Sequence, residues 1–181
     1  DKLIIIDEAY ADFSEGSCVS LINNYSNILV TQTFSKSRGM AGLRVGFCFG
    51  SESLIGGLRA VKNSFNSYPV DTLASLAAIS ATHDDLWFES NIATIVETRS
   101  YFSRELKKIG FRVLPSSANF VLITHASLEA GTLKDHLFKN KILVRHFPET
   151  SVSNWLRITI GKRKDCDVLL SVLKQKISGE N

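Results

Sequence analysis

The chain has 181 residues, of which 44% are hydrophobic and 22% charged, and its formal net charge at neutral pH is +3. This balance is typical of a soluble globular protein, and the small, dispersed positive charge argues against a protein that binds nucleic acid. No apolar run is long enough to span a membrane, and nothing at the N-terminus resembles a signal peptide. The three cysteines and four histidines lack ligand spacing, so we expect reduced thiols in a cytoplasmic protein without a metal site.

Two apolar runs, residues 3–6 and 28–33, predict buried strands that end next to reactive side chains. Asp7 and Tyr10 follow the first strand, and Lys36 follows the second. In a parallel sheet the carboxyl ends of both strands meet at one edge, where open α/β sheets bind ligands. We therefore expect the carboxylate, the phenol and the amine to lie together.

Lys36 at such an edge is suited to covalent chemistry with a carbonyl group. Partial desolvation disfavours its ammonium form, and the neutral amine can then form a Schiff base. Thr33, Ser35 and Arg44 add two hydroxyls and a guanidinium fork, a set suited to one phosphate group. A Ser-Lys-Ser turn before glycine is also common on protein surfaces, so the loop alone does not separate the two interpretations. Together with the upstream carboxylate and phenol, it describes a pocket for pyridoxal phosphate.

Three ordered motifs resemble the fold-type I pyridoxal-phosphate aminotransferases: Asp-Glu-x-Tyr at 7–10, Thr-x-Ser-Lys at 33–36 and Ala-Gly-x-Arg-x-Gly at 41–46. Within these enzymes, the whole stretch 33–46 and the sequence Asn-Trp-Leu-Arg-Ile-Thr-Ile-Gly at 154–161 are most similar to the histidinol-phosphate aminotransferase branch. The resemblance covers essentially the whole chain. Because the family's chain is about twice as long, we expect these residues to be the C-terminal half of an enzyme.

The resemblance implies a role for each residue of the pocket. Lys36 holds the cofactor covalently and then carries a proton between the substrate carbon and the cofactor carbon. Asp7 pairs with the protonated pyridine nitrogen and keeps the ring an electron sink. Tyr10 donates a hydrogen bond to the ring hydroxyl oxygen, and the set of two hydroxyls and one guanidinium binds the cofactor phosphate. Arg38 departs from the expected loop sequence, and the resemblance assigns it no role.

Two arginines near the C-terminus are candidates for binding the substrate. Arg157 resembles the arginine that binds the substrate carboxylate in aminotransferases generally, and in this branch that arginine serves the phosphate of histidinol phosphate. Arg145 is a candidate partner, because two guanidinium groups match a dianionic phosphate. Its alternative interpretation is an arginine at the surface end of a strand.

The resemblance therefore implies transamination between histidinol phosphate and 2-oxoglutarate in histidine biosynthesis, by a protein that forms a homodimer at full length. Three alternatives stay open at this point. The chain could belong to a threonine-phosphate decarboxylase or to another class I/II aminotransferase, or it could be a folded but inactive fragment. Specificity also depends on upstream residues that the family has and this sequence does not contain.

The expected fold class is α/β. Residues 1–90 are expected to form the C-terminal part of the fold-type I large domain, which binds pyridoxal phosphate on a mostly parallel sheet with one antiparallel strand. That antiparallel strand is 43–50, since the short link after 28–33 leaves no room for a crossover helix. Residues 91–181 are expected to form a small α+β domain. The remaining predicted elements are helices at 51–63, 71–83, 86–109, 128–140 and 165–177, and strands at 112–114, 119–124, 142–145 and 155–160.

Overall fold

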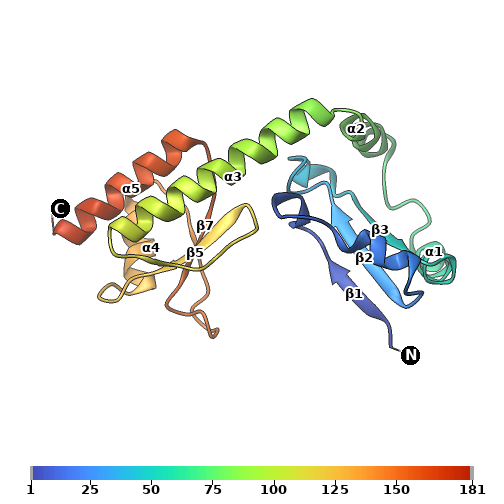
Figure 1. Cartoon of the computed structure of the whole chain (residues 1–181), viewed down its shortest axis with the longest axis horizontal. Helices are drawn as coiled ribbons and strands as arrows, with labels where there is room; N and C mark the ends of the chain where they lie inside the picture. Colours follow the sequence, from blue (N-terminus) through green and yellow to red (C-terminus); the bar gives the residue numbers. More distant parts are fainter. Residues whose placement is uncertain (1, 180–181) are drawn as a thin grey trace. The chain divides into compact units, whose positions relative to one another are not determined.

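A computed structural model describes residues 2–179, which divide into two compact units, one up to Ile92 and the other from Ala93 (Figure 1). The long helix α3 (Asp85–Lys108) begins in the first unit and continues into the second. No helix within the described residues is long and apolar enough to cross a membrane.

The first unit is built on a three-stranded sheet in the order β1-β2-β3. Its strands are β1 (Ile4–Asp7), β2 (Ile28–Thr33) and β3 (Gly46–Gly50). β1 and β2 run parallel with Asp7 opposite Thr31, and β2 and β3 run antiparallel, as predicted, with Thr33 opposite Gly46. β3 begins later than predicted because Ala41–Leu43 forms a 3-10 turn. Two further 3-10 turns, Ala11–Phe13 and Cys18–Asn23, lie between β1 and β2.

The prediction that β1 is buried is wrong for the described residues. Ile4 is 49% exposed and Ile5 is 60% exposed, whereas Val30 of β2 is completely buried. β2 lies between two strands, but β1 is at the end of the strand order and pairs on one side only. Strands of parallel sheets carry apolar residues on both faces because both faces are normally covered by other parts of the protein. Within residues 2–179, the apolar residues of β2 are covered in this way and those of β1 are not.

Helices α1 (Glu52–Phe65) and α2 (Thr72–Thr82) complete the first unit with the start of α3. Leu58 and Val61, which the helical pattern places on an inner face of α1, are exposed. In contrast, α2 buries Ala74 and Ala78 in one cluster with Phe34 and Val45, which flank the lysine-bearing loop. Small residues on α2 therefore pack closely against the segment that holds the predicted chemistry.

The second unit is an antiparallel sheet covered by helices, with strand order β4-β5-β7-β6. Its elements are β4 (Arg112–Val113), β5 (Phe120–Thr124), α4 (Ala130–Lys139), β6 (Arg145–His146), β7 (Leu156–Thr159) and α5 (Arg163–Ser178). Leu156 and Ile158 alternate into one buried cluster with side chains of α3, α4 and α5, as the period-two pattern of this strand predicted. Gly110, with φ of +91°, ends α3 in the conformation that favours glycine.

Candidate active site

The carboxyl edge of the parallel pair brings the three predicted catalytic residues together. Asp7 is the last residue of β1, and one of its carboxylate oxygens accepts a hydrogen bond of 3.0 Å from the backbone NH of Ala9. This turn directs the chain toward Tyr10. The Lys36 Nζ lies 5.2 Å from the centre of the Tyr10 ring, a distance at which an ammonium group is attracted to the ring face. Because β1 and β2 are parallel neighbours, the predicted meeting of Asp7, Tyr10 and Lys36 at one edge of the sheet follows directly.

The predicted phosphate-binding residues lie at the start of the same loop. The Thr33 hydroxyl accepts a hydrogen bond of 3.1 Å from the backbone NH of Ser35 and lies 3.3 Å from the carbonyl oxygen of Val45. Arg44 is held nearby, because the NH of Phe34 donates to the Val45 carbonyl. The guanidinium of Arg44 itself donates to the Ala41 carbonyl at 2.9 Å, and its backbone is left-handed with φ of 56°. A hydrogen bond thus links Thr33 to Ser35, whereas the Arg44 side chain contacts the 3-10 turn that directly precedes it.

Glu8 is a residue near this edge that the sequence analysis passed over. It is 8% exposed and accepts hydrogen bonds from the Ser17 hydroxyl (2.7 Å), the backbone NH of Cys18 (2.5 Å) and the Gln32 amide (2.8 Å). Burial alone raises the pKa of the Glu8 carboxyl, but these hydrogen bonds favour the charged form and together hold the pKa below its usual value.

Glu8 directly follows β1, and its hydrogen bonds connect this end of β1 to β2 and to the start of the 3-10 turn Cys18–Asn23, which lies between the two strands. These hydrogen bonds hold the backbone next to Asp7 in place. The sequence contains a signal for Glu8, because it forms an acidic pair with Asp7 directly after an apolar strand. The motif assigned a role to Asp7 alone.

The two predicted substrate-binding arginines face each other in the second unit. Arg145 of β6 is the register partner of Arg157 of β7. The Arg157 guanidinium carbon lies 5.2 Å from the Phe120 ring centre and 5.7 Å from that of Phe147, and the Arg145 guanidinium carbon lies 5.3 Å from the Phe147 ring centre.

Neither guanidinium of this pair has a carboxylate partner within residues 2–179. The Nε of Arg157 is buried and has no hydrogen-bond partner there. Like charges directly opposite on neighbouring strands are destabilising, and a buried donor without an acceptor costs free energy. An anion bound between the two arginines would remove both costs.

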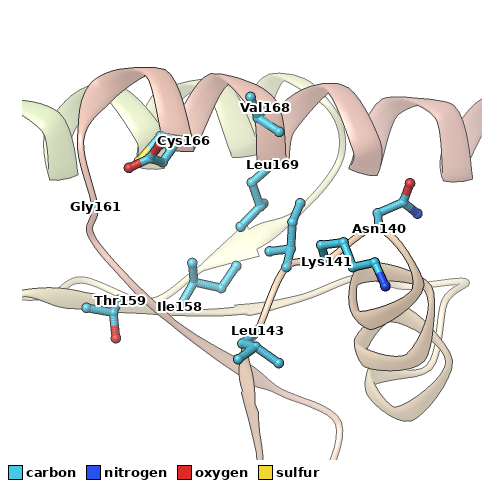
Figure 2. A pocket seen from close by; sticks show the side chains of 11 residues that line it. Asn140, Lys141, Leu143, Ile158, Thr159, Gly161, Cys166, Val168 and Leu169 are labelled. Atoms are coloured by element: carbon cyan, nitrogen blue, oxygen red, sulfur yellow. The ribbon is translucent and has the colours of Figure 1, made fainter.

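Two hollows within residues 2–179 are lined by residues other than the predicted site residues. One hollow of about 470 Å³ in the first unit is lined by Arg38, Met40 and Trp87, beside the loop that carries Lys36. Another of about 420 Å³ lies in the second unit. Figure 2 shows Leu169 projecting from α5 toward the strands in this second hollow, whose lining includes Ile158. Its lining mixes apolar and polar side chains and contains none of the candidate catalytic, cofactor-binding or substrate-binding residues.

The chain is similar to curated aminotransferases along nearly its whole length. The histidinol-phosphate aminotransferase of Acetobacter pasteurianus is 47% identical over 174 residues, which are 96% of this chain and 49% of that protein. The enzyme of the same name from Clostridium botulinum (strain Okra / Type B1) is 44% identical over 178 residues, 98% of this chain and 50% of that protein. The chain thus spans about half the length of the curated relatives it matches.

Solved structures share the fold. The crystal structure of the histidinol-phosphate aminotransferase from Clostridium acetobutylicum superposes with a TM-score of 0.90 at 30% identity, over 98% of this chain and 55% of that one. The enzyme from Sinorhizobium meliloti, solved in complex with pyridoxal 5'-phosphate, superposes with a TM-score of 0.85 at 24% identity, over 99% of this chain and 50% of that one. The fold is therefore that of the fold-type I aminotransferases. Residues 2–173 match the family described as aminotransferase class I and II, and the chain belongs to that family.

Proposed function

We propose that a protein containing this chain transfers an amino group between histidinol phosphate and 2-oxoglutarate with pyridoxal 5'-phosphate, as a step of histidine biosynthesis. The observation that carries this proposal is the Lys36 Nζ lying 5.2 Å from the Tyr10 ring centre, past the carboxyl ends of the parallel strands β1 and β2, where Asp7 is the last residue of β1. The names of the relatives with 44% and 47% identity supply the substrate. In this proposal the residues up to 90 complete the cofactor-binding domain, and those from 91 form the small domain.

The donor set fits pyridoxal phosphate by its chemistry. An exposed carboxylate, a phenol and an amine lie beside two hydroxyl residues, Thr33 and Ser35, that are joined by a hydrogen bond. Arg44, two residues before β3, would complete the phosphate set. Once bound, the cofactor supplies an electron sink that stabilises negative charge on the substrate carbon.

The residues of this chain divide the remaining work. Lys36 would hold the cofactor through its Nζ and, when its amine is free, would move a proton at the reacting carbon. Asp7 accepts the pyridine N–H and so keeps the ring positively charged, a task for which an exposed carboxylate at the sheet edge is suited. Tyr10 donates its phenolic proton to the oxygen substituent of the ring.

The facing arginines of the second unit are proposed to bind the substrate phosphate. Arg145 and Arg157 are register partners on β6 and β7, and the buried Nε of Arg157 is an unused donor within the described residues. A phosphate dianion accepts several hydrogen bonds and neutralises two guanidinium charges. A substrate whose anionic group is a single carboxylate leaves more of this donor capacity unused.

The same residues bear on the competing functions. A decarboxylase from Sulfurospirillum multivorans superposes with a TM-score of 0.86 at 22% identity, a likeness that shows the fold alone. Since the chain spans about half the length of its relatives, we expect the 181 residues alone to turn over poorly. In the longer protein we propose a homodimer that acts on small-molecule substrates.

An absorbance titration tests the proposal. The purified protein is mixed with pyridoxal phosphate, and the visible band of a lysine-bound cofactor is followed before and after addition of histidinol phosphate, with Lys36→Ala alongside. We expect a Lys36-dependent band that disappears with histidinol phosphate and not with threonine phosphate. A band of equal strength in Lys36→Ala would refute the assignment of the lysine, and bleaching by threonine phosphate with release of carbon dioxide would favour the decarboxylase.

A further inference from the structure

Arg38, two residues after Lys36, makes specific contacts with two helices that the sequence of its loop does not predict. Its guanidinium carbon is 3.8 Å from the centre of the Phe88 ring in α3, close enough for stacking of the two planar groups. One of its terminal nitrogens donates to the carbonyl oxygen of Ala81, in the last turn of α2. A single side chain thus links the loop to the end of one helix and the beginning of the next.

The residue between Lys36 and Arg38 is held as well. Ser37 is 1% exposed, and its hydroxyl donates to the Asp12 carboxylate in the turn after β1. The side-chain amide of Asn91 in α3 donates to the Ser37 carbonyl at 3.1 Å. The two residues after the lysine are therefore fixed from opposite sides, by the turn that follows Tyr10 and by the helices.

The loop supplies little of this order by itself. Its backbone closes through a hydrogen bond of 3.0 Å from the Met40 NH to the Phe34 carbonyl and one of 3.2 Å from the Gly39 NH to the Lys36 carbonyl. Gly39 has φ of +68°, a conformation that glycine adopts without strain and also leaves readily. Contacts from outside the loop therefore set the range of conformations that the backbone of Lys36 can adopt.

We propose that Arg38 is a positioning residue for Lys36. Its stacking on Phe88 and its hydrogen bond to the Ala81 carbonyl form a clamp, the Arg38 clamp, that holds the loop so that the lysine amine stays beside the Tyr10 ring. This inference rests on the proposed function of Lys36. Arginine is required rather than lysine, because only a planar guanidinium stacks on a ring and donates in its own plane at the same time.

The experiment compares Arg38→Met and Arg38→Lys with Arg59→Met, a matched control that removes the same charge from an exposed position on α1. The first measurement is amide hydrogen exchange of residues 35–40 in the purified protein without cofactor. The second is the rate at which pyridoxal phosphate and borohydride together label Lys36, mapped by mass spectrometry of peptides.

We expect both Arg38 variants to speed exchange of these amides by about tenfold or more and to slow Lys36 labelling by a similar factor, because methionine makes neither the ring stacking nor the charged hydrogen bond and lysine cannot make both at the same time. Arg59→Met should change neither measurement. If Arg38→Met fails to fold, Phe88→Leu removes the stacking face alone and should shift both measurements in the same direction.

Unchanged exchange and labelling in Arg38→Met would overturn the clamp, and so would an Arg38→Lys variant indistinguishable from the unmodified protein, because charge alone would then suffice. Failure of the proposed function gives a different result. In that case the unmodified protein is not labelled at Lys36 at all, and the positioning role is overturned even if the Arg38 variants speed exchange.

Discussion

In the second unit, Val121 and Ile123 of β5 and Leu156 and Ile158 of β7 are buried in one cluster with side chains of α3, α4 and α5, and all of these strand residues except Ile158 are completely inaccessible to solvent. In the first unit, Ile4 and Ile5 of β1 are about half exposed or more, and Leu58, Val61 and Phe65 of α1 are exposed as well. Both regions carry comparable apolar runs in their sequence. The difference teaches that a hydrophobic pattern indicates which side chains favour burial. It does not indicate which segment of a protein buries them.

The two units also differ in how they present their functional residues. In the first unit, the candidates stand on loops at the end of parallel strands, and neighbouring residues such as Glu8 and Ser37 anchor the backbone. In the second unit, Arg145 and Arg157 stand within paired strands, so their spacing follows from the register. The position of a loop residue depends on many separate contacts, whereas backbone pairing in the sheet fixes the position of a strand residue.

Matched leucine substitutions give the largest contrast between the units. Leu173 on α5 is completely buried, whereas Leu73 on α2 is 76% exposed. We expect Leu173→Ala to lower the free energy of unfolding by about 3 kcal/mol, because it removes buried methyl groups and leaves a cavity. Leu73→Ala should cost less than about 0.5 kcal/mol. Denaturant titrations of both variants check this, and a Leu73→Ala cost equal to that of Leu173→Ala would contradict the difference in cover.

Removing one of the facing arginines should separate binding from stability. Arg157→Met is expected to raise the KM for histidinol phosphate by about 10-fold to 100-fold, since a charged hydrogen bond to phosphate is lost. The thermal midpoint should stay the same or rise, because Arg157 and Arg145 are like charges in register.

Arg112→Met is the control, since that exposed arginine of β4 stacks on Trp155 in the same unit but is not a register partner of either arginine of the pair. Steady-state kinetics and thermal unfolding are measured on a purified longer protein that contains this chain. A marked loss of stability in Arg157→Met with unchanged KM would show that the arginine serves the fold and not the substrate.

The smallest expected effect concerns the pH dependence of the first unit. Because the pKa of Glu8 is lowered in the folded protein, its contribution to stability is present above the unfolded pKa and is lost as the pH falls through the folded pKa. Glu8→Gln should therefore cost about 1 kcal/mol near neutral pH, and the difference from the unmodified protein should shrink under acidic conditions. Unfolding titrations across this pH range provide the measurement, with the exposed Glu52→Gln of α1 as control. A difference that grows on acidification would refute the sign.

The sequence by itself determined the local elements with regular patterns and the positions of the motifs. The strand at Ile28–Thr33 has the predicted bounds, and the antiparallel direction of β3 followed from the short link that precedes it. The long helix α3 ends at Lys108, within one residue of its predicted end, and Gly110 follows with positive φ. These features depend on neighbours in the chain, so a single sequence contains the information for them.

The tertiary structure decided what lies around those elements. It showed that β1 is an exposed strand at the end of the described sheet, that Glu8 is buried in hydrogen bonds, and that Arg38 stacks on a residue 50 positions further along the chain. It also set Arg145 opposite Arg157 across two strands. Each of these depends on contacts between segments far apart in the sequence, and the pattern of one segment does not specify its distant partner.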